Sequence, residues 1–152
     1  MQARMKNPVL VLPETLQALL AVSNSLRDRG LSENTMDLVH LRVSQINGCS
    51  VCTDMGFRKL QKDGETMERI VAVSAWRETP YFSDAERAAL ALGEAVTRLA
   101  DRPDAVTDEI WNEAARHYDE KALSALIVAI ALDNVWNRVN STVRQQAGAS
   151  WN

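Results

Sequence analysis

The chain contains only two cysteines, Cys49 and Cys52, and their reactive thiols stand three positions apart. A disulfide stabilises a protein largely by restricting the unfolded chain, so a bridge that closes so short a loop adds little stability. In a helix, Cα atoms three positions apart lie about 5 Å from each other, which is within the range that a disulfide accepts. A thiol in the first turn of a helix is also favoured as the thiolate, the form that attacks disulfides and peroxides. The pair therefore indicates redox chemistry.

Two other interpretations of the pair stay open. The thiols could form half of a zinc site, but zinc takes four ligands, and the sequence has neither a second cysteine pair nor a His-rich segment. They could also be inert and buried, because free cysteine packs well as a small apolar residue. In a reducing compartment, a close pair is more often catalytic, redox-sensing or metal-binding than structural. We expect the redox role, with no metal and no other cofactor.

Length and composition fit a single domain that spans residues 1–152. The net charge is −3 and acidic and basic side chains are interspersed, so no basic block indicates binding to nucleic acid or to an anionic membrane. No apolar run reaches about 18 residues, and the apolar stretch that follows the first residues is too short for a signal peptide. We therefore expect a cytoplasmic protein with no membrane-spanning segment.

Helix-forming residues dominate the chain, whereas glycine and proline are scarce, at six and four residues. No run of alternating β-branched residues flanked by turn residues indicates a strand. The sequence predicts an all-α fold with about seven helices joined by short connections. The expected helices cover residues 13–29, 33–47, 50–62, 65–76, 84–99, 108–118 and 120–145, with a loop at 77–82. Three tryptophans, Trp76, Trp111 and Trp136, are expected in the core or at a subunit interface, and Trp151 is expected to dock onto another subunit.

Local signals mark several of these helix ends. Ser32 is suited to cap the second helix, and Gly48 is suited to end it. Ser83 and Glu86 form a capping-box pattern ahead of the fifth helix, and Thr107 is placed to cap the sixth. Apolar spacing predicts a buried face on the first helix, formed by Leu16, Leu19, Leu20 and Val22.

The segment Leu41–Cys52, Leu-Arg-Val-Ser-Gln-Ile-Asn-Gly-Cys-Ser-Val-Cys, resembles the AhpD-like alkylhydroperoxidase family within the carboxymuconolactone decarboxylase superfamily. A CxxC pair alone is common, but one preceded by Arg-Val-Ser-Gln-Ile-Asn-Gly is specific. The segments Ala75–Leu90 and Asp133–Asn140 resemble the same family, so the likeness runs in order over residues 37–144. It implies an all-α fold and assembly as a homo-oligomer, often a trimer or hexamer.

The resemblance also implies a peroxidase mechanism. In the family, the second cysteine attacks the peroxide and becomes a sulfenic acid, and the first cysteine condenses with it to form a disulfide that a partner reduces. By position, Cys52 would be the attacking thiol, Cys49 the resolving thiol, and Asp37 would stand where the family has a proton-relaying glutamate. Asp37 could instead form a structural ion pair, with Arg42 or Arg138 as its partner. The expected partners of the protein are a small hydroperoxide substrate and a reducing dithiol or redox protein.

Two positions depart from the family pattern. Gly56 stands where the family has a relay histidine, four residues after the second cysteine, and Val51 stands where some members have another histidine. General acid–base help is typically worth about 10²–10⁴-fold in rate, so the loss of the histidine could leave a slow peroxidase or none. His40, one helical turn from Asp37, could substitute for the missing histidine; the alternative is a surface or interface histidine.

The sequence therefore predicts a thiol-dependent peroxidase or disulfide reductase whose cysteine pair cycles between dithiol and disulfide. A decarboxylase of lactone-type substrates is an alternative within the superfamily, but that chemistry does not need a cysteine pair. A non-catalytic redox sensor or disulfide exchanger is a further alternative, and Gly56 and Val51 favour it.

Overall fold

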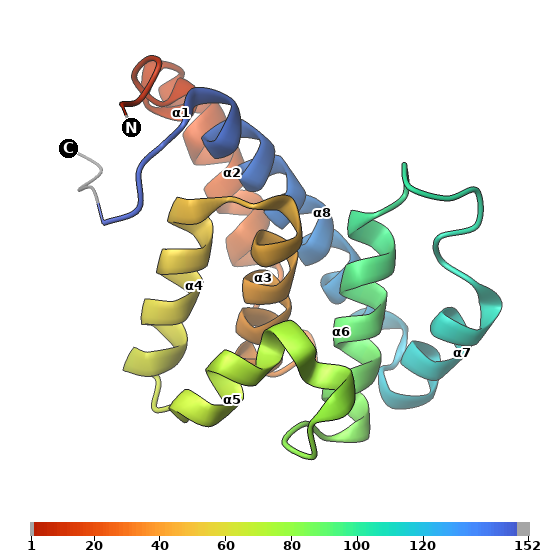
Figure 1. Cartoon of the computed structure of the whole chain (residues 1–152). Coiled ribbons are helices and arrows are strands. Elements are labelled where there is room, and N and C mark those ends of the chain that lie inside the picture. Colours follow the sequence, from red (N-terminus) through yellow and green to blue (C-terminus); the bar gives the residue numbers. More distant parts are fainter. Residues whose placement is uncertain (1, 149–152) are drawn as a thin grey trace.

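The computed structural model describes residues 2–148, and every regular element in that part of the chain is helical (Figure 1). The elements are α1 (Pro8–Val11), α2 (Pro13–Ser25), α3 (Glu33–Asn47), α4 (Ser50–Lys62), α5 (Met67–Ala72), the 3-10 helix η1 (Val73–Glu78), α6 (Asp84–Thr97), α7 (Asp108–His117) and α8 (Glu120–Val143). The prediction of an all-α fold is confirmed. The described residues hold eight α-helices, where about seven were expected, because the short α1 adds one. The residue Trp151 lies outside the described part of the chain.

The helices α3 and α4 form a hairpin (Figure 1), and the two cysteines lie where α4 begins. As predicted, Ser32 caps α3, and its hydroxyl accepts a hydrogen bond from the Thr35 backbone N–H at 3.0 Å. The helix α3 ends at Asn47, and its C-cap is Gly48, whose φ of 66° is a left-handed conformation that costs glycine little. Cys49 then caps α4, so the chain leaves one helix and enters the next within two residues.

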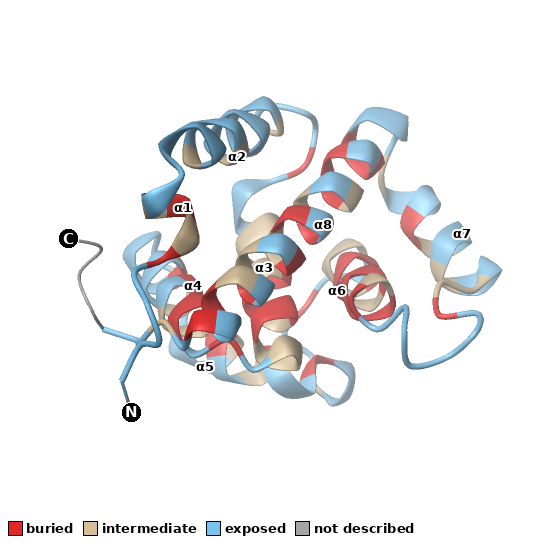
Figure 2. Ribbon diagram, turned by 90° about the horizontal axis from the view of Figure 1, so that it is seen from above, coloured by how far each residue is buried: buried red, intermediate tan, exposed pale blue. Residues whose placement is uncertain are grey.

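The helix α2 is shorter and more exposed than predicted. It ends a turn before residue 29, because Asp28, with a φ of 55°, has already left the helical conformation. The predicted buried face was wrong, since no residue of α2 is buried: Leu16 and Leu19 are half-buried, and Leu20 and Val22 are 48% and 39% exposed. The helix α2 lies on the outside of the bundle (Figure 2), and few of its residues approach α8. It therefore contributes no buried residue to the hydrophobic core.

The segment expected to form one helix at 65–76 consists of α5 and η1. The backbone leaves the helical conformation at Ala75, with φ −127° and ψ 33°. This break turns Trp76 into the core, where its side chain is 4% exposed and its indole N–H donates to Glu94 at 3.1 Å. The burial and hydrogen bond of Trp76 therefore override the local helical pattern, and η1 continues into the loop expected to begin at residue 77.

The later helix starts follow the predicted caps. Ser83 accepts a hydrogen bond from the Glu86 backbone N–H, and the Glu86 carboxylate accepts one from the Ser83 N–H at 2.8 Å, which completes the capping box of α6. Thr107 caps α7. On α7, Trp111 is 42% exposed, so the core position considered for it was wrong within this chain.

The helices α3, α6 and α8 form the centre of the fold, and the buried residues concentrate there (Figure 2). By length and composition alone, α8 is apolar enough to cross a membrane, at a mean hydropathy of 1.3, but the core helix of a soluble protein passes the same test. Its buried residues include three asparagines, Asn134, Asn137 and Asn140. The side chains buried most completely come largely from the three central helices, and they include Leu38, Leu41, Val43, Leu90, Leu92, Leu126 and Ile130.

Candidate active site

The two cysteines lie at the start of α4 and are joined in a disulfide, with their Cα atoms 5.4 Å apart. Cys49 is the N-cap, and its Sγ accepts a hydrogen bond from the Cys52 backbone N–H at 3.4 Å. Both side chains are buried. The first N–H groups of a helix lack partners within it and favour negative charge, so this turn favours a thiolate. The structure brings the two predicted cysteines together at the helix start that the sequence predicted.

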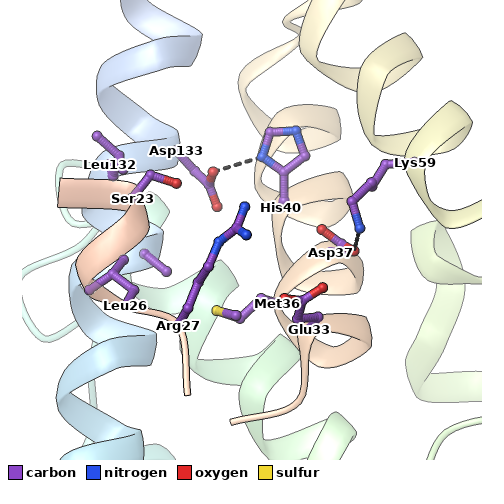
Figure 3. A pocket seen from close by; sticks show the side chains of 11 residues that line it. Ser23, Leu26, Arg27, Glu33, Met36, Asp37, His40, Lys59, Leu132 and Asp133 are labelled. Carbon is purple, nitrogen blue, oxygen red and sulfur yellow. Dashed lines mark hydrogen bonds and ion pairs between the residues drawn. The ribbon is translucent and has the colours of Figure 1, made fainter. Parts of the chain in front are cut away.

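A histidine and an aspartate from two other helices meet next to this turn. His40 on α3 places Nδ1 2.7 Å from Oδ1 of Asp133 on α8 (Figure 3). The other ring nitrogen, Nε2, lies 3.3 Å from the backbone carbonyl oxygen of Cys52. Both nitrogens face oxygen acceptors, which suits the doubly protonated ring. Burial opposes this charge, but the Asp133 carboxylate and the Cys52 carbonyl outweigh burial and raise the pKa of His40 above its ordinary value.

Gly56 leaves room for the His40 ring. A Cβ atom at position 56 would lie 2.9 Å from His40 Cδ2 and 3.5 Å from Nε2, and the first distance is closer than real Cβ contacts. Gly56 is also buried and follows Cys52 by one helical turn on α4. An imidazole supplied by α3 therefore fills the space beside the position where the family pattern has its relay histidine on α4.

The carboxylate of Asp37 pairs with Lys59 on α4, with Oδ2 and Nζ 3.0 Å apart (Figure 3). The two partners considered from the sequence were wrong. Arg42 instead pairs with Glu94 on α6 at 2.6 Å, and Arg138 donates to a residue of its own helix. Arg42 follows Asp37 by five positions and so points to another side of α3. Burial raises the pKa of Asp37, although the nearby ammonium of Lys59 opposes the shift.

A cavity of about 210 Å³ opens beside these side chains. Figure 3 shows Arg27, which follows α2, extending into it. Four apolar residues, Leu26, Met36, Ala129 and Leu132, line part of the wall. The rest of the lining is polar or charged and consists of Ser23, Arg27, Glu33, Asp37, His40, Lys59 and Asp133.

A second hollow of about 290 Å³ lies beside the disulfide and is lined by Cys49, Asn140 and Arg144, among others. Cys52 contacts residues of both spaces, because its carbonyl touches His40 and its Sγ lies 3.3 Å from Asn140 Nδ2. The structure thus places Asp37 in the cavity with His40 and places Cys49 in the second hollow.

Neither Asp133 nor Asn140 was predicted from the sequence to be functional. Both lie at the ends of the segment Asp133–Asn140 that resembles the family, which was the available signal. The contact of Asp133 with His40 spans 93 positions, a separation over which local patterns carry no information. Between residues 2 and 148, no group of three or more His, Cys, Asp or Glu side chains is arranged to hold a metal ion.

The helical fold and the CxxC pair together define an AhpD-like protein. The chain belongs to the carboxymuconolactone decarboxylase family, whose family model matches residues 13–95. The resemblance inferred from the sequence is therefore confirmed. The uncharacterised protein YdfG of Bacillus subtilis (strain 168) is 32% identical over 139 residues, which cover 91% of this chain and 93% of YdfG.

Two solved structures show the same fold. A protein of unknown function from Agrobacterium tumefaciens, described as a candidate antioxidant defence protein AhpD, aligns with a TM-score of 0.89 at 32% identity over 98% of this chain and 100% of its own. The debrominase Bmp8 aligns with a TM-score of 0.76 at 21% identity over 90% of this chain and 73% of its own, a likeness that shows the fold alone. The fold thus occurs in enzymes, and the cysteine pair of this chain fits a redox role.

Proposed function

We propose that this protein is a thiol-dependent peroxidase that reduces a small hydroperoxide and is itself reduced by a dithiol. One observation carries the proposal: the backbone carbonyl of Cys52, in the first turn of α4, contacts a histidine that holds a proton beside a cavity. His40 touches the Cys52 carbonyl, is oriented by Asp133, and lines a cavity of about 210 Å³. Membership of the family supports the same conclusion.

The chemistry proceeds in three steps. The Cys52 thiolate attacks the terminal peroxide oxygen, so that an S–O bond forms as the O–O bond breaks. Cys52 is oxidised to the sulfenic acid, and the alkoxide that leaves takes up one proton and departs as an alcohol. The Cys49 thiolate then attacks the Cys52 sulfur, and an S–S bond forms as hydroxide leaves and is protonated to water. An external dithiol reduces this disulfide by exchange and is oxidised in turn.

Two side chains handle the protons in this scheme. His40 is the donor to the leaving oxygens, because its raised pKa keeps a proton on a ring that Asp133 orients. Asp37 lines the same cavity and stands where the family has a proton-relaying glutamate, so this scheme assigns it as the acceptor of the proton that the Cys52 thiol gives up. Burial raises the pKa of Asp37, which makes it a stronger base than an ordinary aspartate.

Two alternative functions make different predictions. A decarboxylase of lactone-type substrates would not need Cys49 or Cys52, whereas a redox sensor or disulfide exchanger would oxidise without continuous peroxide turnover.

The single domain over residues 1–152, the homo-oligomeric assembly and the cytoplasmic location remain predictions from the sequence.

Trapping the first intermediate tests the proposal. The reduced Cys49→Ser protein would be mixed with an equimolar amount of a small organic hydroperoxide and then with dimedone, which reacts with sulfenic acids. Mass spectrometry should locate the adduct on Cys52. The wild-type protein should form the Cys49–Cys52 disulfide and stay unlabelled, and Cys52→Ser should also stay unlabelled. A Cys49→Ser protein that acquires no label would contradict the proposal.

A further inference from the structure

A chain of hydrogen bonds connects the N-terminal segment to the Cys52 sulfur. Asn140 on α8 donates from Nδ2 to Cys52 Sγ at 3.3 Å. Asn7, the N-cap of α1, donates from Nδ2 to Asn140 Oδ1 at 2.7 Å, and its own Oδ1 accepts from the Val9 backbone N–H at 3.2 Å. The side chains of Asn7, Asn140 and Cys52 are only 2–3% exposed, so the chain runs through the protein interior.

The backbone fixes the direction of this chain. The two ends of an asparagine amide have the same shape, but a backbone N–H can only donate. Asn7 therefore turns its oxygen toward Val9 and its NH₂ group toward Asn140. The oxygen of Asn140 is then occupied, and its NH₂ group faces the sulfur. The start of α1 thus determines that Cys52 Sγ meets a donor rather than an acceptor.

The hydrogen bond from Asn140 matters because the backbone N–H at the start of α4 is directed at the sulfur of Cys49 and not at the sulfur of Cys52. The Cys52 backbone N–H is directed at Cys49 Sγ, at 3.4 Å. Asn140 supplies an N–H to Cys52 Sγ, which is a disulfide sulfur in this structure. Once the disulfide is reduced, the same N–H faces the thiolate, and a hydrogen bond to the charged form of a group stabilises that form. The charged residues that face this turn from neighbouring elements are His40, at the Cys52 carbonyl, and Arg144, beside Cys49.

We propose that Asn140 is a catalytic residue that stabilises the Cys52 thiolate by donating to its sulfur, and that Asn7 is a positioning residue that keeps the Asn140 amide in this orientation. The inference rests on the proposed function, because that function makes the Cys52 thiolate the attacking species. The ionisation of Cys52 can nevertheless be measured without any turnover.

Ultraviolet titration of the thiolate tests the inference. In a Cys49→Ser background Cys52 is the one remaining thiol, and the protein that also carries Cys52→Ser serves as the blank. Asn140→Leu and Asn7→Ser should each move the midpoint of thiolate formation upward by about one to two pH units, which is what losing a hydrogen bond to a charged group implies. Asn7→Ser retains a side chain able to cap α1, but it is too short to reach Asn140.

Asn137→Leu is the matched control. It removes another buried asparagine of α8, which bonds Asn47 and Ser44 rather than a sulfur, and it should leave the midpoint in place. An unmoved midpoint in Asn140→Leu or Asn7→Ser overturns the inference, as does an equal shift in Asn137→Leu. If Asn140→Leu fails to fold, Asn7→Ser decides the question.

The two proposals fail in distinguishable ways. A raised midpoint in a protein that consumes no peroxide supports thiolate stabilisation by Asn140 and refutes the peroxidase. Peroxide consumption with an unmoved midpoint refutes the role of Asn140 and Asn7 and leaves the peroxidase standing.

Discussion

The close approach of His40 to Gly56 predicts that these two positions are coupled in stability. The substitution Gly56→Ala adds a Cβ atom that would lie 2.9 Å from His40 Cδ2 and 3.5 Å from the backbone Cα of Leu41. The ring makes room by moving away. That movement breaks its 2.7 Å hydrogen bond to Asp133 and its 3.3 Å contact with the Cys52 carbonyl.

Two opposing effects set the size of the coupling. Alanine is favoured over glycine in a helix interior by about 1 kcal/mol. A hydrogen bond to a charged group contributes about 1.5–3 kcal/mol. The lower part of that range applies, because the His40 side chain is 26% exposed and water replaces part of the bond. In the wild-type protein, Gly56→Ala should therefore lower the free energy of unfolding by about 0.5–1 kcal/mol. In a His40→Ala background, the same change should raise it by about 1 kcal/mol.

Urea denaturation of the four proteins in this cycle measures the coupling, which we expect to be about 1.5–2 kcal/mol. Gly93→Ala on α6 is the control, since its Cβ would approach Val39 rather than His40. Its effect should be the same with and without His40→Ala. If the effects of Gly56→Ala and His40→Ala add to within about 0.5 kcal/mol, the inferred contact between the two positions is refuted.

Three further predictions concern His40, its neighbour Gly56 and the buried carboxylate of Glu94. In a steady-state assay, Gly56→His alone should slow peroxide consumption, because the new histidine side chain collides with His40. Adding His40→Ala should restore the rate, and no recovery would show that the two positions do not share a role. The free energy of unfolding should fall as the pH rises from the ordinary pKa of 6.5 through the raised pKa of His40, since the native state holds that proton more tightly, and denaturation at several pH values should show a flatter profile for His40→Gln. Glu94→Ala should lower the free energy of unfolding, measured by urea denaturation, by about 3–5 kcal/mol, because it leaves Arg42 and the Trp76 indole N–H without their buried acceptor. A loss below about 1 kcal/mol would contradict the role of Glu94 as that acceptor.

Helix ends that depend on local chemistry could be predicted from the sequence. The bounds of α3 and α4 match the prediction, because the Ser32 cap and the left-handed Gly48 act on their immediate neighbours. The break between α5 and η1 could not be predicted. It depends on Trp76 reaching Glu94, 18 positions along the chain, and this pairing exists only once the helices have packed.

In the candidate site, too, features that depend on local spacing could be predicted from the sequence, and contacts between distant residues could not. The cysteine pair could be predicted because its chemistry depends on a spacing within one helical turn. The role of His40 could be stated only as an alternative, since its partner Asp133 lies 93 positions away on α8. Gly56 looked like the loss of a relay residue, whereas the structure shows that it accommodates the ring of His40. The pairing of Asp37 was missed because Lys59 lies on the next helix, 22 positions away.

Steady-state consumption of a small organic hydroperoxide, with a dithiol in excess, measures whether the protein is a peroxidase, which is the claim made here for its function. We expect the wild-type protein to consume many molar equivalents, Cys52→Ser to consume none, and His40→Ala to be slower by about 10²-fold or more. A wild-type protein that forms the Cys49–Cys52 disulfide but consumes no more than a single equivalent would contradict the claim. Such a protein would be a redox sensor or a disulfide exchanger rather than a peroxidase.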